Sequence, residues 1–434
     1  MTDSSNTKTL EAKCSCGSVH FTVDIPKTSL PFRVHLCHCS LCRFTLGLPC
    51  VFHTHLPMGI RPKFVGPSSE ANMTHYVVPE SRGSVSFCST CGCHIACIGL
   101  EKGNWVPATS IFTDHGPENF QIGMHIYTKS VKDEGISKML THIGGREFGV
   151  YNPPEDSPKA KLLESEPEVG EDGKDRMRAQ CHCGGVSFTF PRPTEEVIND
   201  EYMSKYVSHL DKTKWHACFD ACDDCRRVNG THVVGWTFIP LALCEPPIKP
   251  DLLIGTAKTY QSSPDVLRSF CGTCGATFFY SIEERRPTDR QQVVDLSTGV
   301  LRAPEGGMAE NWLTWRARLA WLGSGKRFDN AFTEALQEGM NKYVLEKEGR
   351  IEDYNIGKYL HTRGEIHNRP CSLLLVMLLR TEARPSGYLS GVRMPATKMP
   401  GPSPTVSGAL DSVTELNFHL INPELHTQSP VIEP

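Results

Sequence analysis

The stretch Cys37-His38-Cys39-Ser40-Leu41-Cys42-Arg43 carries three thiols within six residues. A zinc ion held by three protein ligands keeps one tetrahedral position open, and this distinguishes a catalytic zinc from a structural one. The residues alone leave three interpretations: an open zinc site, a single cluster shared with other cysteines, or thiols that carry no metal at rest. The cysteines on either side of the stretch bear on this choice.

Two cysteine pairs flank the triplet. Cys14 and Cys16 precede it with i, i+2 spacing, which places both sulfurs on one face of a strand. Cys88 and Cys91 follow it, and Gly92 supplies the backbone freedom that a tight knuckle needs. Four thiols make a coordinatively closed set, which is typical of structural zinc. Metal binding by this set would contribute directly to folding, because it joins distant points of the chain.

The same pattern recurs in the second half of the chain. Cys42 and Cys88 have 45 residues between them, and so do Cys225 and Cys271. The second copy supplies Cys181, Cys183, Cys271 and Cys274 as its outer set and Cys218, Cys222 and Cys225 as its triplet. The spacing of this triplet differs, because Asp220 stands where the first copy has Cys37. An i, i+4, i+7 set on a helical turn would still converge on one metal. Asp220 is an alternative ligand for that metal. The remaining interpretation is that the second copy is catalytically silent.

The order of the segments predicts a mainly β fold with two tandem zinc-binding domains. Both domains, 14–151 and 179–300, contain short alternating runs that are typical of strands. The intervening segment 152–178 is rich in Pro, Glu, Lys and Asp, which predicts a linker.

After the second copy, the apolar residues recur with the period of a helix. Ala309–Leu322 and Phe328–Val344 have apolar residues at helical spacing, which predicts two amphipathic helices within a helical extension, 301–363. Residues 364–434 show no sustained period, and we expect them to be disordered.

Composition restricts the class of protein. The 434 residues include 19 cysteines and carry a formal net charge of −4, which argues against nucleic acid as a partner. Met1–Lys13 lacks the apolar core of a secretory signal, and the longest apolar run, Leu373–Leu379, is too short to span a membrane. We therefore expect a cytoplasmic protein, with the nucleus as the alternative, no membrane partner, and reduced thiols that serve as metal ligands.

Several neighbouring residues have less specific interpretations. His38 lies between ligands, and we expect it to support them rather than to bind metal. Cys93 and Cys97 lie in an apolar run, which favours a place in the core. Arg43 and Arg226 follow the last cysteine of each triplet, and each would either bind a substrate carboxylate or pair with a local acid.

The first copy resembles the glutathione-dependent formaldehyde-activating enzyme and centromere protein V family over about 14–130. The resemblance rests on Cys14-x-Cys16-Gly17, Cys37-His38-Cys39-x2-Cys42-Arg43-x3-Gly47 and Phe87-Cys88-x2-Cys91-Gly92. The second copy is similar over 179–300, apart from its altered triplet. The resemblance implies a β-tent fold, a structural zinc at the outer four cysteines and a catalytic zinc at the triplet. This amounts to two zinc ions per domain, and the altered triplet leaves the second site of the second domain open.

The resemblance also implies carbon–sulfur lyase chemistry, in which glutathione adds reversibly to formaldehyde to give S-hydroxymethylglutathione. Our first hypothesis is therefore an enzyme that adds a glutathione-type thiol to formaldehyde or a related small electrophile, with Cys37, Cys39 and Cys42 as the catalytic residues. The alternative is a non-catalytic tandem zinc module that binds a protein or a nucleic acid. A third hypothesis, motivated by the surplus cysteines, is a thiol-based redox or metal-buffering protein.

Overall fold

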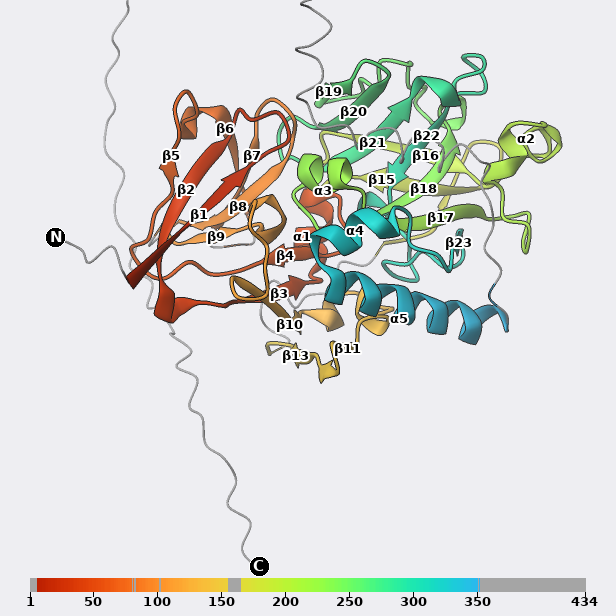
Figure 1. Ribbon diagram of the computed structural model, residues 1–434. Helices are drawn as coiled ribbons and strands as arrows, with labels where there is room; N and C mark the ends of the chain where they lie inside the picture. Colours follow the sequence, from red (N-terminus) through yellow and green to blue (C-terminus); the bar gives the residue numbers. More distant parts are fainter. Residues whose placement is uncertain are drawn as a thin grey trace, which may run out of the picture. The chain divides into compact units, whose positions relative to one another are not determined.

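The computed structural model describes residues 6–79, 81, 83–100, 103–154, 165–349 and 351 (Figure 1). Strands predominate over helices in these residues, which confirms the predicted mainly β fold. None of the described helices is long and apolar enough to cross a membrane. The predicted disordered tail, 364–434, lies outside the described residues.

The first half of the chain begins with two small antiparallel sheets, ordered β1-β2-β5 and β6-β7-β8-β9. In β2 the alternate residues Phe21, Val23 and Ile25 are buried, as expected for a strand with one face on the core. The strands are β1 (Thr7–Lys13), β2 (His20–Pro26), β5 (Lys63–Phe64), β6 (Met73–Val77), β7 (Gly83–Cys88), β8 (His94–Gly99) and β9 (Trp105–Pro107).

A third sheet positions the cysteine triplet. Its order is β13-β10-β3-β4, with β3 parallel to β10 and antiparallel to β4. Helix α1 (Ser40–Leu46) follows β3 and ends at Gly47, whose φ of 71° is the left-handed conformation that glycine accommodates without strain. The strands of this sheet and of the adjoining hairpin are β3 (Phe32–Cys37), β4 (Val51–His53), β10 (Phe120–Ile126), β11 (His142–Ile143), β12 (Arg146–Glu147) and β13 (Gly149–Tyr151).

The second half contains a three-stranded sheet, β14-β15-β16, and a seven-stranded sheet ordered β19-β20-β21-β22-β18-β17-β23. Helix α2 (Glu195–Asn199) precedes β17, and α3 (Asp223–Asn229) follows it, as α1 follows β3. The strands are β14 (Glu168–Val169), β15 (Asp175–Gln180), β16 (Ser187–Pro191), β17 (Trp215–Asp220), β18 (Val234–Pro240), β19 (Ala257–Ser263), β20 (Val266–Cys271), β21 (Thr277–Ile282), β22 (Val293–Ser297) and β23 (Leu313–Trp315).

The predicted helix over Ala309–Leu322 is wrong. Leu313–Trp315 forms strand β23, which pairs in parallel with β17, and both Ala309 and Trp321 have positive φ, which a right-handed helix does not permit. The segment predicted as a linker also differs from a plain connection, because β14 and most of β15 lie within 165–178. In both places strand pairing decides the structure, between β23 and the distant β17 and between β14, β15 and β16 in and after the predicted linker. Composition does not reveal such pairing.

The second predicted helix is confirmed. Helix α5 (Asn330–Glu348) follows α4 (Leu322–Phe328), and the side chain of Asp329 caps α5 by accepting a hydrogen bond from the Phe332 N–H. Its buried residues include Leu336 and Met340 from the predicted apolar stripe.

Equivalent residues of the two halves contact each other reciprocally. In each contact a glycine of one half lies so close to the other half that a Cβ atom would overlap its neighbour. Exchanged contacts of this kind are typical of a two-fold pair of subunits, here within one chain. The pairs are Gly47 with Thr277, Gly230 with His94, Gly92 with Phe270, and Gly275 with Phe87.

Candidate metal centres

Four cysteines of the first half come together from two places in the fold. Cys14 follows β1, Cys16 lies in the turn before β2, Cys88 ends β7 and Cys91 lies in the next turn. Their sulfurs lie within 4.8 Å of one another, and Cys16 Sγ is 3.5 Å from both Cys14 Sγ and Cys88 Sγ. A zinc tetrahedron with 2.3 Å bonds has edges of about 3.8 Å. The set therefore has the composition and nearly the size of a closed four-thiolate site.

The second half repeats this arrangement. Cys181, Cys183, Cys271 and Cys274 also place their sulfurs within 4.8 Å, and Cys183 Sγ is 3.5 Å from both Cys181 Sγ and Cys271 Sγ. The Val186 N–H donates to Cys181 Sγ at 3.4 Å. Hydrogen bonds to sulfur favour the thiolate form, which is the form that binds metal. Both outer sets predicted from the sequence are thus brought together.

The triplet of the first half converges at the end of β3. Cys37 is the last residue of β3, Cys39 is the N-cap of α1, and Cys42 lies in the first turn of that helix. Cys37 Sγ is 3.5 Å from Cys39 Sγ and 3.6 Å from Cys42 Sγ, and the Cys42 N–H donates to Cys39 Sγ at 3.3 Å. All three residues are buried, and the group contains three ligands among the described residues. A zinc ion held there would take its fourth ligand from outside the group.

The buried His38 side chain, between two cysteines of the triplet, takes part in a chain of hydrogen bonds. Its Nε2 lies 2.8 Å from His125 Nδ1, and His125 Nε2 lies 2.7 Å from the carbonyl oxygen of Leu140. Because a carbonyl only accepts, His125 Nε2 carries the proton and His38 Nε2 donates to His125 Nδ1. Burial, with His125 and Arg43 nearby, lowers the pKa of His38 well below its usual value. The chain of neutral rings orients the backbone between Cys37 and Cys39.

The two arginines beside the triplets pack between the halves of the chain. Arg226 donates to the carbonyl oxygen of Ser110, stacks its guanidinium 3.8 Å from the Phe328 ring centroid, and has Asp223 at 3.7 Å. Arg43 is 6% exposed, and burial lowers its pKa to about 10 although Asp133 and Cys39 oppose the shift. These contacts favour local pairing and packing for Arg226 over substrate binding.

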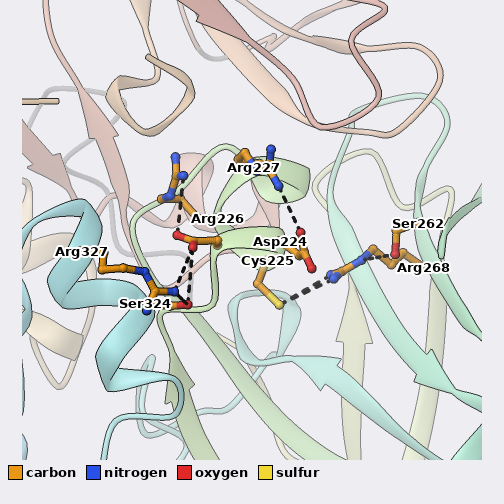
Figure 2. A network of polar contacts seen from close by, with 9 residues as sticks. Asp224, Cys225, Arg226, Arg227, Ser262, Arg268, Ser324 and Arg327 are labelled. Atoms are coloured by element: carbon orange, nitrogen blue, oxygen red, sulfur yellow. Dashed lines mark hydrogen bonds and ion pairs between the residues drawn. The ribbon is translucent and has the colours of Figure 1, made fainter. Parts of the chain in front are cut away.

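The triplet region of the second half differs from that of the first half in the charged groups that surround it. Asp220, Cys222 and Cys225 place their ligand atoms within 4.8 Å, and the Cys222 N–H donates to Asp220 Oδ1 at 2.6 Å. Figure 2 shows the guanidinium of Arg268 pointing at Cys225, with Nη1 and Nη2 at 3.6 and 3.8 Å from Sγ and Nε bonded to Ser262. Burial disfavours the charge of Arg268, but the adjacent Cys225 sulfur raises its pKa. A fixed cation therefore stands beside this group of ligands.

The structure does not bring Cys218 into the second triplet. The i, i+4, i+7 interpretation fails because Cys218 and Asp220 lie on strand β17, and α3 begins only at Asp223. Cys218 is buried opposite Trp236 of β18. Asp220, the alternative ligand, takes the place that corresponds to Cys37.

One cluster was missed by sequence reasoning. His53, His94 and Cys97 form a further group whose ligand atoms lie within 4.8 Å of one another, although Cys97 was assigned to the core. Burial lowers the pKa of His94 to about 4, so the ring is neutral at neutral pH. His94 and Cys97 are three residues apart on β8, but His53 lies on β4 of another sheet, and no local spacing in the sequence connects it to them.

The comparison with family models agrees with the cysteine geometry. Residues 9–130 match the family described as glutathione-dependent formaldehyde-activating enzyme. The match contains the closed set and the triplet of the first half. Among curated proteins, none matches the chain. The first half of the chain is therefore similar to the glutathione-dependent formaldehyde-activating enzyme family over residues 9–130, as the cysteine pattern predicts.

Proposed function

We propose that the first half of the chain is a zinc-dependent carbon–sulfur lyase that adds a glutathione-type thiol reversibly to formaldehyde or a related small electrophile. One observation carries the proposal. Cys37, Cys39 and Cys42 hold three sulfurs at nearly tetrahedral spacing, apart from a closed four-cysteine set in the same half. A closed set stabilises the fold, whereas a three-ligand set accepts a further ligand.

The reaction forms one carbon–sulfur bond. The thiol sulfur adds to the carbonyl carbon, the carbonyl π electrons move to oxygen, and the thiol proton ends on that oxygen. Zinc bound by the triplet would lower the pKa of an incoming thiol and so supply a thiolate at neutral pH. The chain's own contribution is to fix the three sulfurs: the Cys42 N–H bonds to Cys39 Sγ, and the His38–His125 pair holds the intervening backbone.

The second half has a different role in this proposal. Arg268 places a permanent cation 3.6 Å from Cys225 Sγ, and this opposes the binding of a second cation by Asp220, Cys222 and Cys225. We assign this half to the non-catalytic alternative, a zinc module that packs against the first half through the reciprocal glycine contacts.

Two-dimensional exchange NMR tests the proposal. Glutathione and formaldehyde exchange with their adduct, and the zinc-loaded full chain should accelerate this exchange above the rate without protein. Protein that is fully loaded with zinc and folded, yet leaves the exchange rate unchanged, would refute the assigned substrates.

A further inference from the structure

His53, His94 and Cys97 bring two imidazoles and one thiol together in the first half. His53 Nε2 lies 2.7 Å from His94 Nε2, and the sulfur of Cys97 lies within 4.8 Å of a ring nitrogen of each histidine. The histidines are 3% and 2% exposed, and Cys97 is half-buried. The ligand atoms are therefore gathered at a place that is shielded on the histidine side and more open on the cysteine side.

A β-bulge turns His94 and Cys97 to the same side of β8. In a regular strand, residues three apart point to opposite faces. Here Phe87 pairs with His94 while Ser86 pairs with Ala96, so that one extra residue interrupts the alternation. A β-bulge changes the direction in which a side chain points, and bulges are frequent next to functional sites. The cluster thus depends on an irregularity of the backbone and not on chance proximity of long side chains.

The register of β3 and β4 places the cluster beside the triplet. His53 pairs with His35, and His35 and Cys37 are two apart on β3, so His53 and Cys37 share one face of this sheet. Burial lowers the pKa of His94, and the charge of Cys42 opposes this shift. The two groups of ligands are neighbours, and they have no ligand atom in common.

The second half has no such cluster within residues 165–349, which the structure describes. Trp236, Thr277 and Tyr280 occupy the positions that correspond to His53, His94 and Cys97, at the same spacing from the shared cysteines. The same bulge is present there, since Phe270 pairs with Thr277 while Ser269 pairs with Phe279. The β-bulge is therefore present in both halves, but only the first half has metal-binding side chains at these three positions.

We propose that His53 Nε2, His94 Nε2 and Cys97 Sγ form a third metal centre of the first half, which binds a divalent cation of the zinc class. Imidazole and thiolate are the ligands that zinc prefers, and three of them leave a position for a small ligand. Zinc–nitrogen bonds of about 2.0–2.1 Å at a tetrahedral angle separate two nitrogens by about 3.3 Å. The two rings would need to part only slightly from their present 2.7 Å.

Cadmium-113 NMR of the full chain tests this centre without any assay of activity. The chain is reconstituted with ¹¹³Cd, whose resonance moves to higher shielding as nitrogen replaces sulfur among its ligands. We expect one resonance of a mixed nitrogen and sulfur site in addition to the sulfur-rich resonances of the cysteine groups. His53→Gln and Cys97→Ser should each remove that resonance and about one equivalent of bound cadmium.

A neighbouring histidine provides the matched control. His55 is exposed, stacks on His35 at 5.3 Å between ring centroids and is not part of the cluster. His55→Gln should keep the mixed resonance. The sulfur-rich resonances report whether each variant is folded, and Cys97→Ser decides the matter if His53→Gln loses them. Absence of a mixed resonance in the unaltered chain, or its persistence in Cys97→Ser, would show that the two histidines are merely hydrogen-bonded to each other.

Discussion

The two halves of this chain agree where their cysteines make closed sets and differ where their triplets lie. Both closed sets have the same four ligands and the same 3.5 Å sulfur spacing. At the triplets, Asp220 replaces Cys37, and Arg268 stands at the position of Val85, three residues before the shared cysteine of the closed set. The comparison shows that one scaffold can keep both four-cysteine sets while a cation is added beside one of the two triplets.

The energetic meaning of this difference follows from Coulomb's law. Two unit charges about 4 Å apart interact by about 4 kcal/mol at an effective dielectric constant of 20. A buried guanidinium beside Cys225 can therefore take over much of the stabilisation that a bound cation would give to a thiolate. In the first half the equivalent position is the apolar Val85, so this strand places no cation beside Cys37, Cys39 and Cys42.

The largest effect is expected at the closed sets, where the halves should behave alike. Cys91→Ala and Cys274→Ala each remove one ligand of a four-thiolate site whose metal contributes on the order of 10 kcal/mol to folding. Because a domain has a net stability of only about 5–15 kcal/mol, we expect each variant to lose its structure. Circular dichroism and zinc content of the purified variants measure this.

Cys42→Ala is the control for that experiment. It removes a triplet sulfur and should leave the chain folded. If it unfolds the chain as severely as Cys91→Ala does, the triplet is a structural site and the proposed division between the two kinds of site fails.

An intermediate effect is expected at the reciprocal contacts. Gly47→Ala and Gly230→Ala each place a Cβ against the backbone of the opposite half, at Thr277 and His94, and both glycines have positive φ. We expect each to lower the free energy of unfolding by about 2–4 kcal/mol. Urea denaturation measures the change.

Gly59 supplies the comparison for these variants. Its φ is +83°, and nothing lies within 4 Å of the Cβ that alanine would add. Gly59→Ala should cost only the backbone term, about 1–2 kcal/mol. Equal losses in all three variants would mean that the contacts between the halves contribute nothing measurable.

A smaller effect is expected at the second triplet, where the halves should become more alike. Arg268→Val gives the second half the residue that the first half has at this position. Without the guanidinium, the group of Asp220, Cys222 and Cys225 should bind cobalt(II) or zinc at least about tenfold more tightly, because the repulsion between two cations is removed. Competition with a chelator measures the affinity.

Arg227→Val is the matched control, since Arg227 is more exposed and pairs with Asp224 at 3.2 Å (Figure 2). It should leave the affinity unchanged. If the Arg268→Val chain is folded and binds metal no better than the unaltered chain, the charge of Arg268 does not oppose metal binding in the second half.

The sequence predicts the closed sets and the first triplet because their ligands are close in the chain or stand at a repeated spacing. Helix α5 was likewise predicted from a sustained apolar stripe. The second triplet was predicted incorrectly at Cys218, because a helical spacing was read across a strand. The His53 cluster is missed because a bulge and a contact between two sheets bring its members together. Arg268 is missed because it reaches Cys225 of α3 from the distant strand β20, and such a contact leaves no local pattern.

We propose that thiol–aldehyde chemistry belongs to the first triplet and not to the second. The most direct measurement is the rate of glutathione–formaldehyde adduct exchange, by two-dimensional exchange NMR, with the zinc-loaded variants Cys42→Ala and Cys225→Ala. We expect Cys42→Ala to abolish the acceleration and Cys225→Ala to leave it unchanged. Acceleration that survives in Cys42→Ala, or is lost in a folded Cys225→Ala chain, would contradict this proposal.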